Sequence, residues 1–132
     1  MTMKYLLFFT GVFFLFAGCE RKTSSLDALY KEVMVVHDEV MPWMSDIMRY
    51  KKQIREKVDS TADGEATELK ALMNQLDAAD KAMMDWMRNF SRNDYKVMSE
   101  EEASAYLQDQ KQKIEEVRKT MREALDKAKK AI

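Results

Sequence analysis

The chain has 132 residues, the length of a single domain, and its 22 Lys and Arg against 23 Asp and Glu leave a formal net charge of −1. Such a near-neutral balance offers no electrostatic footprint for nucleic acid, which requires a strongly basic face. The single cysteine excludes an intramolecular disulfide, so packing must hold the fold.

The amino terminus is predicted to be an export signal. Lys4 precedes an apolar run over residues 5–16, and the small residues Ala17 and Gly18 precede Cys19. A cation, an apolar run and small residues before a cleavage point are typical of a secretory signal. The run is shorter than the roughly 20 residues that a membrane-spanning helix requires.

The segment Phe16-Ala17-Gly18-Cys19 resembles the lipobox of bacterial lipoproteins, with Phe16 where leucine is usual. In that class the cysteine thiol receives a diacylglyceryl group, the chain is cut before the cysteine, and the new amino group is acylated. The resemblance implies that residues 1–18 are a lipoprotein signal peptide and that Cys19 is the lipidation site. An uncleaved anchor and a plain signal with a chance cysteine are the alternatives.

The same resemblance predicts a location in the cell envelope. Glu20 rather than Asp follows the cysteine, which favours an outer-membrane lipoprotein facing the periplasm or the cell surface. Residues 19–25 are interpreted as a lipidated tether, and the six residues after the cysteine reach at most about 20 Å. The rest of the chain would then lie close to the bilayer.

Residues 26–58 are predicted to form the first helix. Two sets of apolar residues each recur every seven positions, and the second set follows the first by three, which is the pattern of a helical seam. This seam consists of Leu26, Leu29, Val33, Val36, Val40, Trp43, Ile47, Tyr50 and Ile54. Pro42 is predicted to kink the helix on its outward face and to bend it around the core without breaking it.

Two further helices are predicted, over residues 65–90 and 99–131, after a turn at residues 60–64 and a longer connection at 91–98. The first has an apolar stripe that includes Trp86. Ser99 begins the second helix as a capping box with Glu102. The stripe of this last helix is interrupted by a polar residue, so we expect it to pack most loosely. The stripes are Leu69, Leu72, Met73, Leu76, Met83, Trp86, Met87 and Phe90, and then Leu107, Ile114, Val117, Met121, Leu125 and Ala128, with Gln110 as the interruption.

These elements predict an all-α fold. Short connections make neighbouring helices antiparallel, so residues 26–132 are expected to form an up-down-up three-helix bundle. The alternative is a longer coiled coil that completes its core by self-association. Pro42, Trp43, Trp86 and Ser99 are expected to act structurally in either arrangement.

The candidate site is a row of methionines around the only histidine of the chain, His37. Steps of three and four residues place this row on one face of the first helix. If the first two helices fold back on each other at the turn at residues 60–64, His37 lies at the same height along the bundle as Trp86. If the last two helices fold back in the same way at the connection at 91–98, Ala103 and Tyr106 lie at that height too. The expected metal ligands are Met34, His37, Met41, Met83, Met84 and Met87.

The row has three possible interpretations. Methionines are flexible and fill irregular cores, so the row could be packing alone. Thioethers and a neutral imidazole also select Cu(I) or Ag(I) over zinc or iron, and similar ligands occur in periplasmic copper carriers. A methionine-rich groove could instead bind peptides or unfolded chains, as a chaperone does.

Enzyme activity is not expected. His37 and Ser45 are eight residues apart and cannot pair on one helix, and a di-iron bundle would require glutamate where Met34 stands. The sequence therefore predicts no catalytic residue and no cofactor apart from the lipid at Cys19, with Cu(I) as the alternative.

Three segments resemble a group of small, uncharacterised bacterial envelope lipoproteins, some of which carry the name "viral A-type inclusion protein". They are His37-Asp38-Glu39-Val40-Met41-Pro42, Ala79-Asp80-Lys81-Ala82-Met83-Met84-Asp85-Trp86-Met87, and Tyr106-Leu107 with Lys111. The resemblance implies no activity. The expected function is a lipid-anchored interaction or structural module, whose partners are the membrane and either an envelope protein or another copy of the chain, without nucleic acid.

Overall fold

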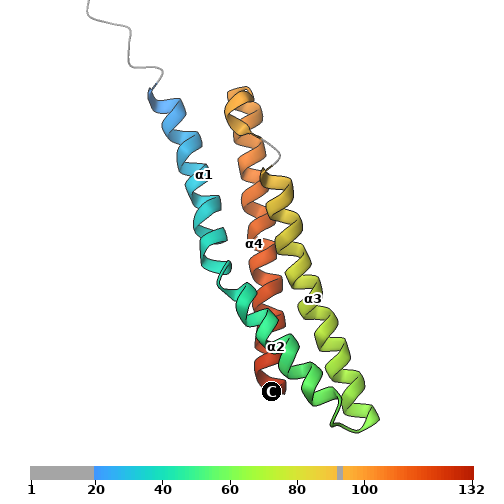
Figure 1. Ribbon diagram of the computed structural model, residues 1–132. Coiled ribbons are helices and arrows are strands. Elements are labelled where there is room, and N and C mark those ends of the chain that lie inside the picture. Colours follow the sequence, from blue (N-terminus) through green and yellow to red (C-terminus); the bar gives the residue numbers. More distant parts are fainter. Residues whose placement is uncertain (1–19, 92–93) are drawn as a thin grey trace, which may run out of the picture.

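The computed structural model describes residues 20–91 and 94–132, so the predicted signal peptide and Cys19 lie outside the described residues (Figure 1). The described ranges form helices and contain no strand. The elements are α1 (Glu20–Val40), α2 (Trp43–Val58), α3 (Asp63–Ser91), the 3-10 helix η1 (Tyr95–Val97) and α4 (Glu100–Ala131).

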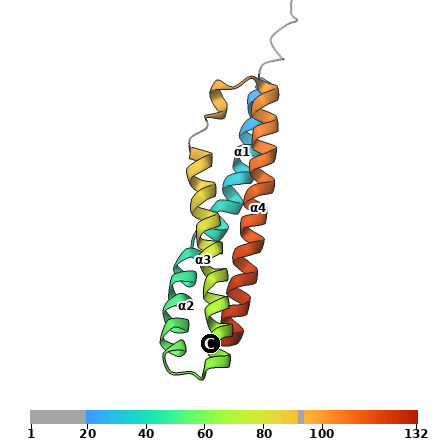
Figure 2. The same ribbon diagram turned by 90° about the vertical axis from the view of Figure 1, so that its right-hand side faces the viewer.

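The elements pack as a three-helix bundle in which α1 and α2 together make one arm. Seen from the side, α3 runs back along this arm, and α4 runs parallel to the arm (Figure 2). The predicted all-α, up-down-up bundle is confirmed. Its helices also agree with the predicted ranges 65–90 and 99–131 to within two residues.

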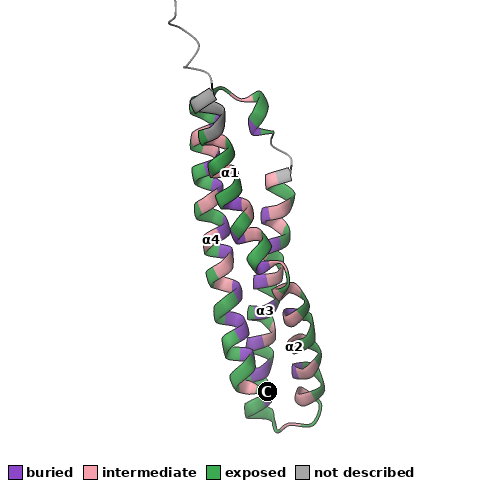
Figure 3. Ribbon diagram, turned by 90° about the vertical axis from the view of Figure 1, so that its left-hand side faces the viewer, coloured by how far each residue is buried: buried purple, intermediate pink, exposed green. Residues whose placement is uncertain are grey.

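The apolar seam of the first arm faces the core. Val33, Val40, Ile47 and Ile54 are fully buried, and the buried residues follow the inner sides of the helices (Figure 3). Each such side chain contributes about 1.5–3 kcal/mol to folding. The other seam residues are Val36, which is buried, and Leu26, Leu29, Trp43 and Tyr50, which are partly buried. The heptad pattern therefore identified the core face of this arm.

The first arm is broken at Pro42, and the prediction of one continuous kinked helix is wrong. α1 ends at Val40 and α2 begins at Trp43. Pro42 has no N–H to donate to the carbonyl four residues earlier. The N–H groups of Met44 and Ser45 then bond carbonyls three residues back, at 3.2 Å each. The chain therefore turns more tightly here, and the two halves of the arm take different directions (Figure 1).

The predicted tether is also corrected, because α1 already begins at Glu20. Residues 20–25 contain neither glycine nor proline, so nothing in the segment stops the helix from extending outward. A helix rises about 1.5 Å per residue, so these six residues span about 9 Å instead of about 20 Å.

α4 is the central helix of the bundle, which corrects the expectation that it packs most loosely. It packs against α1, α2, α3 and η1. Gln110, the interruption of its stripe, is buried, and its Nε2 donates to Oδ2 of Asp109 at 3.1 Å. The buried amide therefore has a hydrogen-bond partner, although Asp109 itself is exposed, and the polar residue does not loosen the helix.

The capping box of α4 is present as predicted. Ser99 Oγ accepts from the N–H of Glu102 at 3.3 Å, and Glu102 Oε2 accepts from the N–H of Ser99 at 3.0 Å. The hydroxyl of Ser99 also donates to Glu102 Oε2 at 2.7 Å. These bonds stabilise the charged carboxylate and lower the pKa of Glu102.

Replacing the cap gives the first testable prediction. Ser99→Ala is expected to lower the free energy of unfolding by about 1 kcal/mol at neutral pH, measured by urea unfolding. Because the pKa of Glu102 is lower in the folded protein, its contribution is present above the pKa of the unfolded glutamate and is lost as pH falls through the folded value. The free energies of unfolding of the variant and of the unmodified protein should therefore become more similar in acid. If they became less similar in acid, the capping role of Ser99 would be contradicted.

Candidate functional site

The bend at Pro42 separates the upper part of the first arm from α3. α2 packs against both α3 and α4, whereas α1 packs mainly against α4. The ribbons of α1 and α3 accordingly diverge above the bend (Figure 1). Side chains rather than close backbone contact fill the space between these two helices.

A cleft of about 620 Å³ lies between α1 and α3 and is bounded at one end by η1. Most of its lining is aromatic or thioether, and the charged groups among its described lining residues belong to η1 and to the residue before it. The lining residues are Tyr30, Met34 and His37 of α1, Trp86, Met87 and Phe90 of α3, and Asp94, Tyr95 and Lys96. This set is called the α1–α3 cleft below.

Aromatic rings form a continuous wall along the cleft. The ring centroids of Tyr30 and Tyr95 are 5.3 Å apart, those of Tyr30 and Phe90 are 6.0 Å apart, and all three rings are stacked. Phe90 stacks on Trp86 at 4.8 Å, and His37 lies tilted against Trp86 at 5.7 Å. Packed rings have few rotamers left to them, so the wall is preorganised.

The contact between His37 and Trp86 confirms that these two residues are level, as the pairing of the first two helices predicted. The prediction that Ala103 and Tyr106 of α4 lie at the same height as Trp86 is wrong. The hydroxyl of Tyr106 donates to the carbonyl of Phe90 at 3.4 Å, one turn beyond Trp86. Ala103 lies in a separate upper core with Tyr95.

The polar groups around the cleft are held in defined positions. The hydroxyl of Tyr95 donates to Asp27 Oδ1 at 3.4 Å, and burial, followed by the nearby Asp27 carboxylate, raises the pKa of Tyr95. Asp94 Oδ1 accepts the backbone N–H of Lys96 at 3.0 Å and caps η1. Trp86 is 6% exposed, and among the described residues its buried Nε1 has no hydrogen-bond partner.

Among the described residues, His37 has one ring hydrogen bond, to the neighbouring Asp38, whose side chain is 72% exposed. Its Nδ1 lies 2.9 Å from Oδ1 of Asp38, and its side chain is 18% exposed. A carboxylate only accepts hydrogen bonds, so in the neutral ring the proton is on Nδ1 and the lone pair is on Nε2. The second nitrogen of the ring is therefore available to a ligand.

The structure brings together three of the six predicted metal ligands. Met34, His37 and Met87 line the α1–α3 cleft. Met83 is 0% exposed in the main core, and Met41 packs against that core. The sixth, Met84, is 44% exposed and does not line the cleft. Of the residues expected to be structural, Trp43 lies apart from the cleft, with Arg122 5.4 Å above its ring.

Sequence reasoning missed Tyr30, Phe90 and Tyr95 as site residues. Tyr30 stands four residues before Met34, so the spacing of the methionine row extends to it and could have indicated it. Phe90 was assigned only to an apolar stripe. Tyr95 lies in the connection before α4, where no periodic pattern indicates which way a side chain points.

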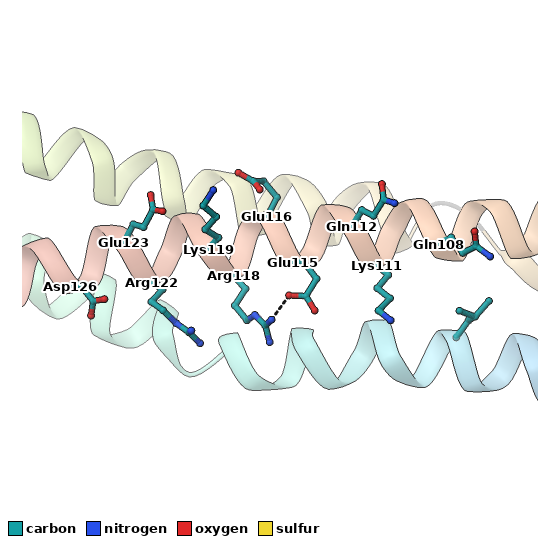
Figure 4. Close-up of a pocket in the computed structure, with 11 residues that line it drawn as sticks. Gln108, Lys111, Gln112, Glu115, Glu116, Arg118, Lys119, Arg122, Glu123 and Asp126 are labelled. Carbon is teal, nitrogen blue, oxygen red and sulfur yellow. Dashed lines mark ion pairs between the residues drawn. The ribbon is translucent and has the colours of Figure 1, made fainter.

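A second, charged groove of about 810 Å³ follows α4. Its acidic and basic side chains occur in short blocks of like sign along the helix. Several of them point toward α1, while others point away from it (Figure 4). Arg118 pairs with Glu115 and with Glu39 of α1, and Lys111 pairs with Glu32 of α1. These pairs hold α1 parallel to α4, so the groove is explained by helix packing.

Among the described residues, no three His, Cys, Asp or Glu side chains form a group that could hold a metal ion. In the same part of the chain, no helix is both long enough and apolar enough to cross a membrane. No protein-family model, curated protein or solved structure matches the chain.

Proposed function

We propose that the protein is a lipid-anchored component of the cell envelope that binds a ligand or partner in the α1–α3 cleft and catalyses no reaction. The observation that carries the proposal is the cleft itself, a surface of stacked aromatic rings and thioethers into which His37, Asp94 and Lys96 bring polar groups. Concave sites of this composition are typical of ligand binding. Among the described lining residues, none is a serine, threonine or cysteine that could act as a nucleophile beside His37.

The position of the cleft suits a protein attached at Cys19. α1 begins at Glu20, and Tyr30 and His37 then lie about 15 and 26 Å along the helix from its start. η1 lies at the same end of the bundle (Figure 2), and its Val97 is 84% exposed. An acylated Cys19 would therefore hold the cleft near the bilayer, and several acyl chains make such an anchor stable.

The anchor is tested by Cys19→Ala. Metabolic acyl labelling should disappear and the uncleaved precursor should accumulate, because the thiol that carries the lipid is gone. A serine in the folded domain provides the matched control, since Ser104→Ala should leave the labelling unchanged. Equal labelling of the Cys19 variant and the unmodified protein would refute the anchor.

Binding near the bilayer is tested by crosslinking in intact cells. The anchored protein should give a reproducible crosslinked product that is absent or strongly reduced with Cys19→Ala. The absence of any reproducible product, together with turnover of a substrate by the purified protein, would overturn the proposed function.

A further inference from the structure

We propose that the α1–α3 cleft binds a soft monovalent cation, Cu(I) or Ag(I), through Met34, His37 and Met87 beside the ring of Trp86. The inference rests on the proposed function, because it requires the cleft to be the binding site, and it names the class of ligand.

His37 is oriented as a metal-binding histidine. Histidines that ligate metals commonly donate their other ring N–H to a carboxylate, which fixes the tautomer and makes the ligating nitrogen more basic. Asp38 accepts from Nδ1 of His37 at 2.9 Å in this way. Nε2 is thereby left as the ligating atom, in a ring that already lines the cleft.

Two thioethers line the same cleft. Met34 stands three residues before His37 and therefore lies on the same face of α1. Met87 reaches the cleft from α3 and adjoins Trp86, whose ring is 5.7 Å from that of His37. Methionine has three rotatable bonds, so both sulfur atoms can converge on a small ion. Two thioethers and one imidazole form a soft ligand set, which favours Cu(I) or Ag(I) over zinc.

The surroundings favour a positive charge. An aromatic face within about 6 Å of a cation attracts it, and tryptophan does so most strongly. Among the described residues, Asp38 places a carboxylate beside His37, and Asp94 and Lys96 contribute one carboxylate and one cation to the lining. Trp86 is almost completely buried, so a cation beside its ring would be shielded from water on that side.

The arrangement also predicts which methionines do not take part. Met84 belongs to the same helix as Met87 but is exposed and lies outside the lining. It provides a matched control, because Met→Leu removes a sulfur atom and changes the side-chain volume little.

The experiment titrates the purified mature protein, in which the sulfur of Cys19 carries the lipid and is no longer a free thiol, with Cu(I), kept reduced by ascorbate, against a chromogenic Cu(I) chelator. We expect one equivalent to bind with submicromolar affinity. His37→Gln, Met34→Leu and Met87→Leu should each weaken binding at least tenfold, whereas Met84→Leu should change it less than twofold. A second readout uses Trp43→Phe, which leaves Trp86 as the only tryptophan, and here Ag(I) should quench the emission stoichiometrically while Zn(II) does not.

Circular dichroism of each variant establishes that it is folded before its affinity is compared. The inference is overturned if the unmodified protein does not compete with the chelator, or if the cleft variants and Met84→Leu bind equally. Failure of the titration while crosslinking of the anchored protein persists would reject the metal and keep the proposed function. If the unmodified protein showed neither acyl labelling nor a crosslinked product but still bound Cu(I), the lipid anchor and the partner near the bilayer would be rejected and the metal site would be kept.

Discussion

Val40→Asp is expected to lower the free energy of unfolding by about 4 kcal/mol or more. Val40 is the last residue of α1 and is 0% exposed in the main core. An aspartate there must either bury an unpaired charge or take up a proton, and both options cost free energy. Urea unfolding followed by circular dichroism measures the change.

Val35→Asp is the matched control for this prediction. It makes the same chemical change five residues earlier on α1, where the side chain is 66% exposed. Its effect should stay within about 1 kcal/mol, because it concerns only surface charges. Equal effects of the two substitutions would contradict the assignment of the core face of α1.

Trp86→Ala is expected to lower the free energy of unfolding by about 3–5 kcal/mol, the usual result of deleting a buried tryptophan. Trp86 stacks on Phe90, contacts His37 and belongs to the main core as well as to the cleft. Its removal would leave a cavity that neighbouring rings cannot fill without moving. Unfolding is again followed by circular dichroism, because the substitution removes one of two tryptophans.

Trp86→Phe distinguishes the contribution of aromatic packing to stability from that of the indole nitrogen. Since Nε1 of Trp86 has no hydrogen-bond partner among the described residues, replacing it breaks no hydrogen bond. The phenylalanine variant should therefore lose clearly less stability than the alanine variant. If both variants lost the same free energy, the role given to ring packing would be wrong.

The fold class could be predicted from the sequence because the core residues of the first arm recur with a regular seven-residue spacing. Heptad spacing on the first arm located Val33, Val40, Ile47 and Ile54, and all four are fully buried. The break at Pro42 could not be predicted in the same way. Whether a proline bends a helix or ends it depends on what packs against each half. Here α1 packs mainly against α4, whereas α2 packs against both α3 and α4.

The pairing of α3 with α4 was mispredicted because the connection does not simply turn back. η1 and the first turns of α4 lie beyond the end of α3, so α4 starts higher than a symmetric turn would place it (Figure 2). Tyr106 consequently meets Phe90, and Ala103 packs with Tyr95. A connection of this length has no periodicity from which its direction could be read.

Only part of the candidate site could be predicted, because spacing along one helix shows which residues share a face but not how two helices separate. Spacing along α1 brought Met34 and His37 together, and the first turn placed Trp86 beside them. Spacing could not show that Met83 would enter the core while Met87 lines the cleft. That difference depends on how far α1 separates from α3 above the bend.

If a ligand binds in the α1–α3 cleft at His37, the ring nitrogens of that residue report the binding. The chain has one histidine, so a two-bond ¹H–¹⁵N spectrum of the untagged protein at about pH 8 contains a single imidazole. We expect a ring protonated on Nδ1, in which equimolar Ag(I) shifts the Nε2 resonance and leaves Nδ1 nearly unchanged. A ring protonated on Nε2, or resonances that stay unchanged at saturating Ag(I), would contradict this expectation.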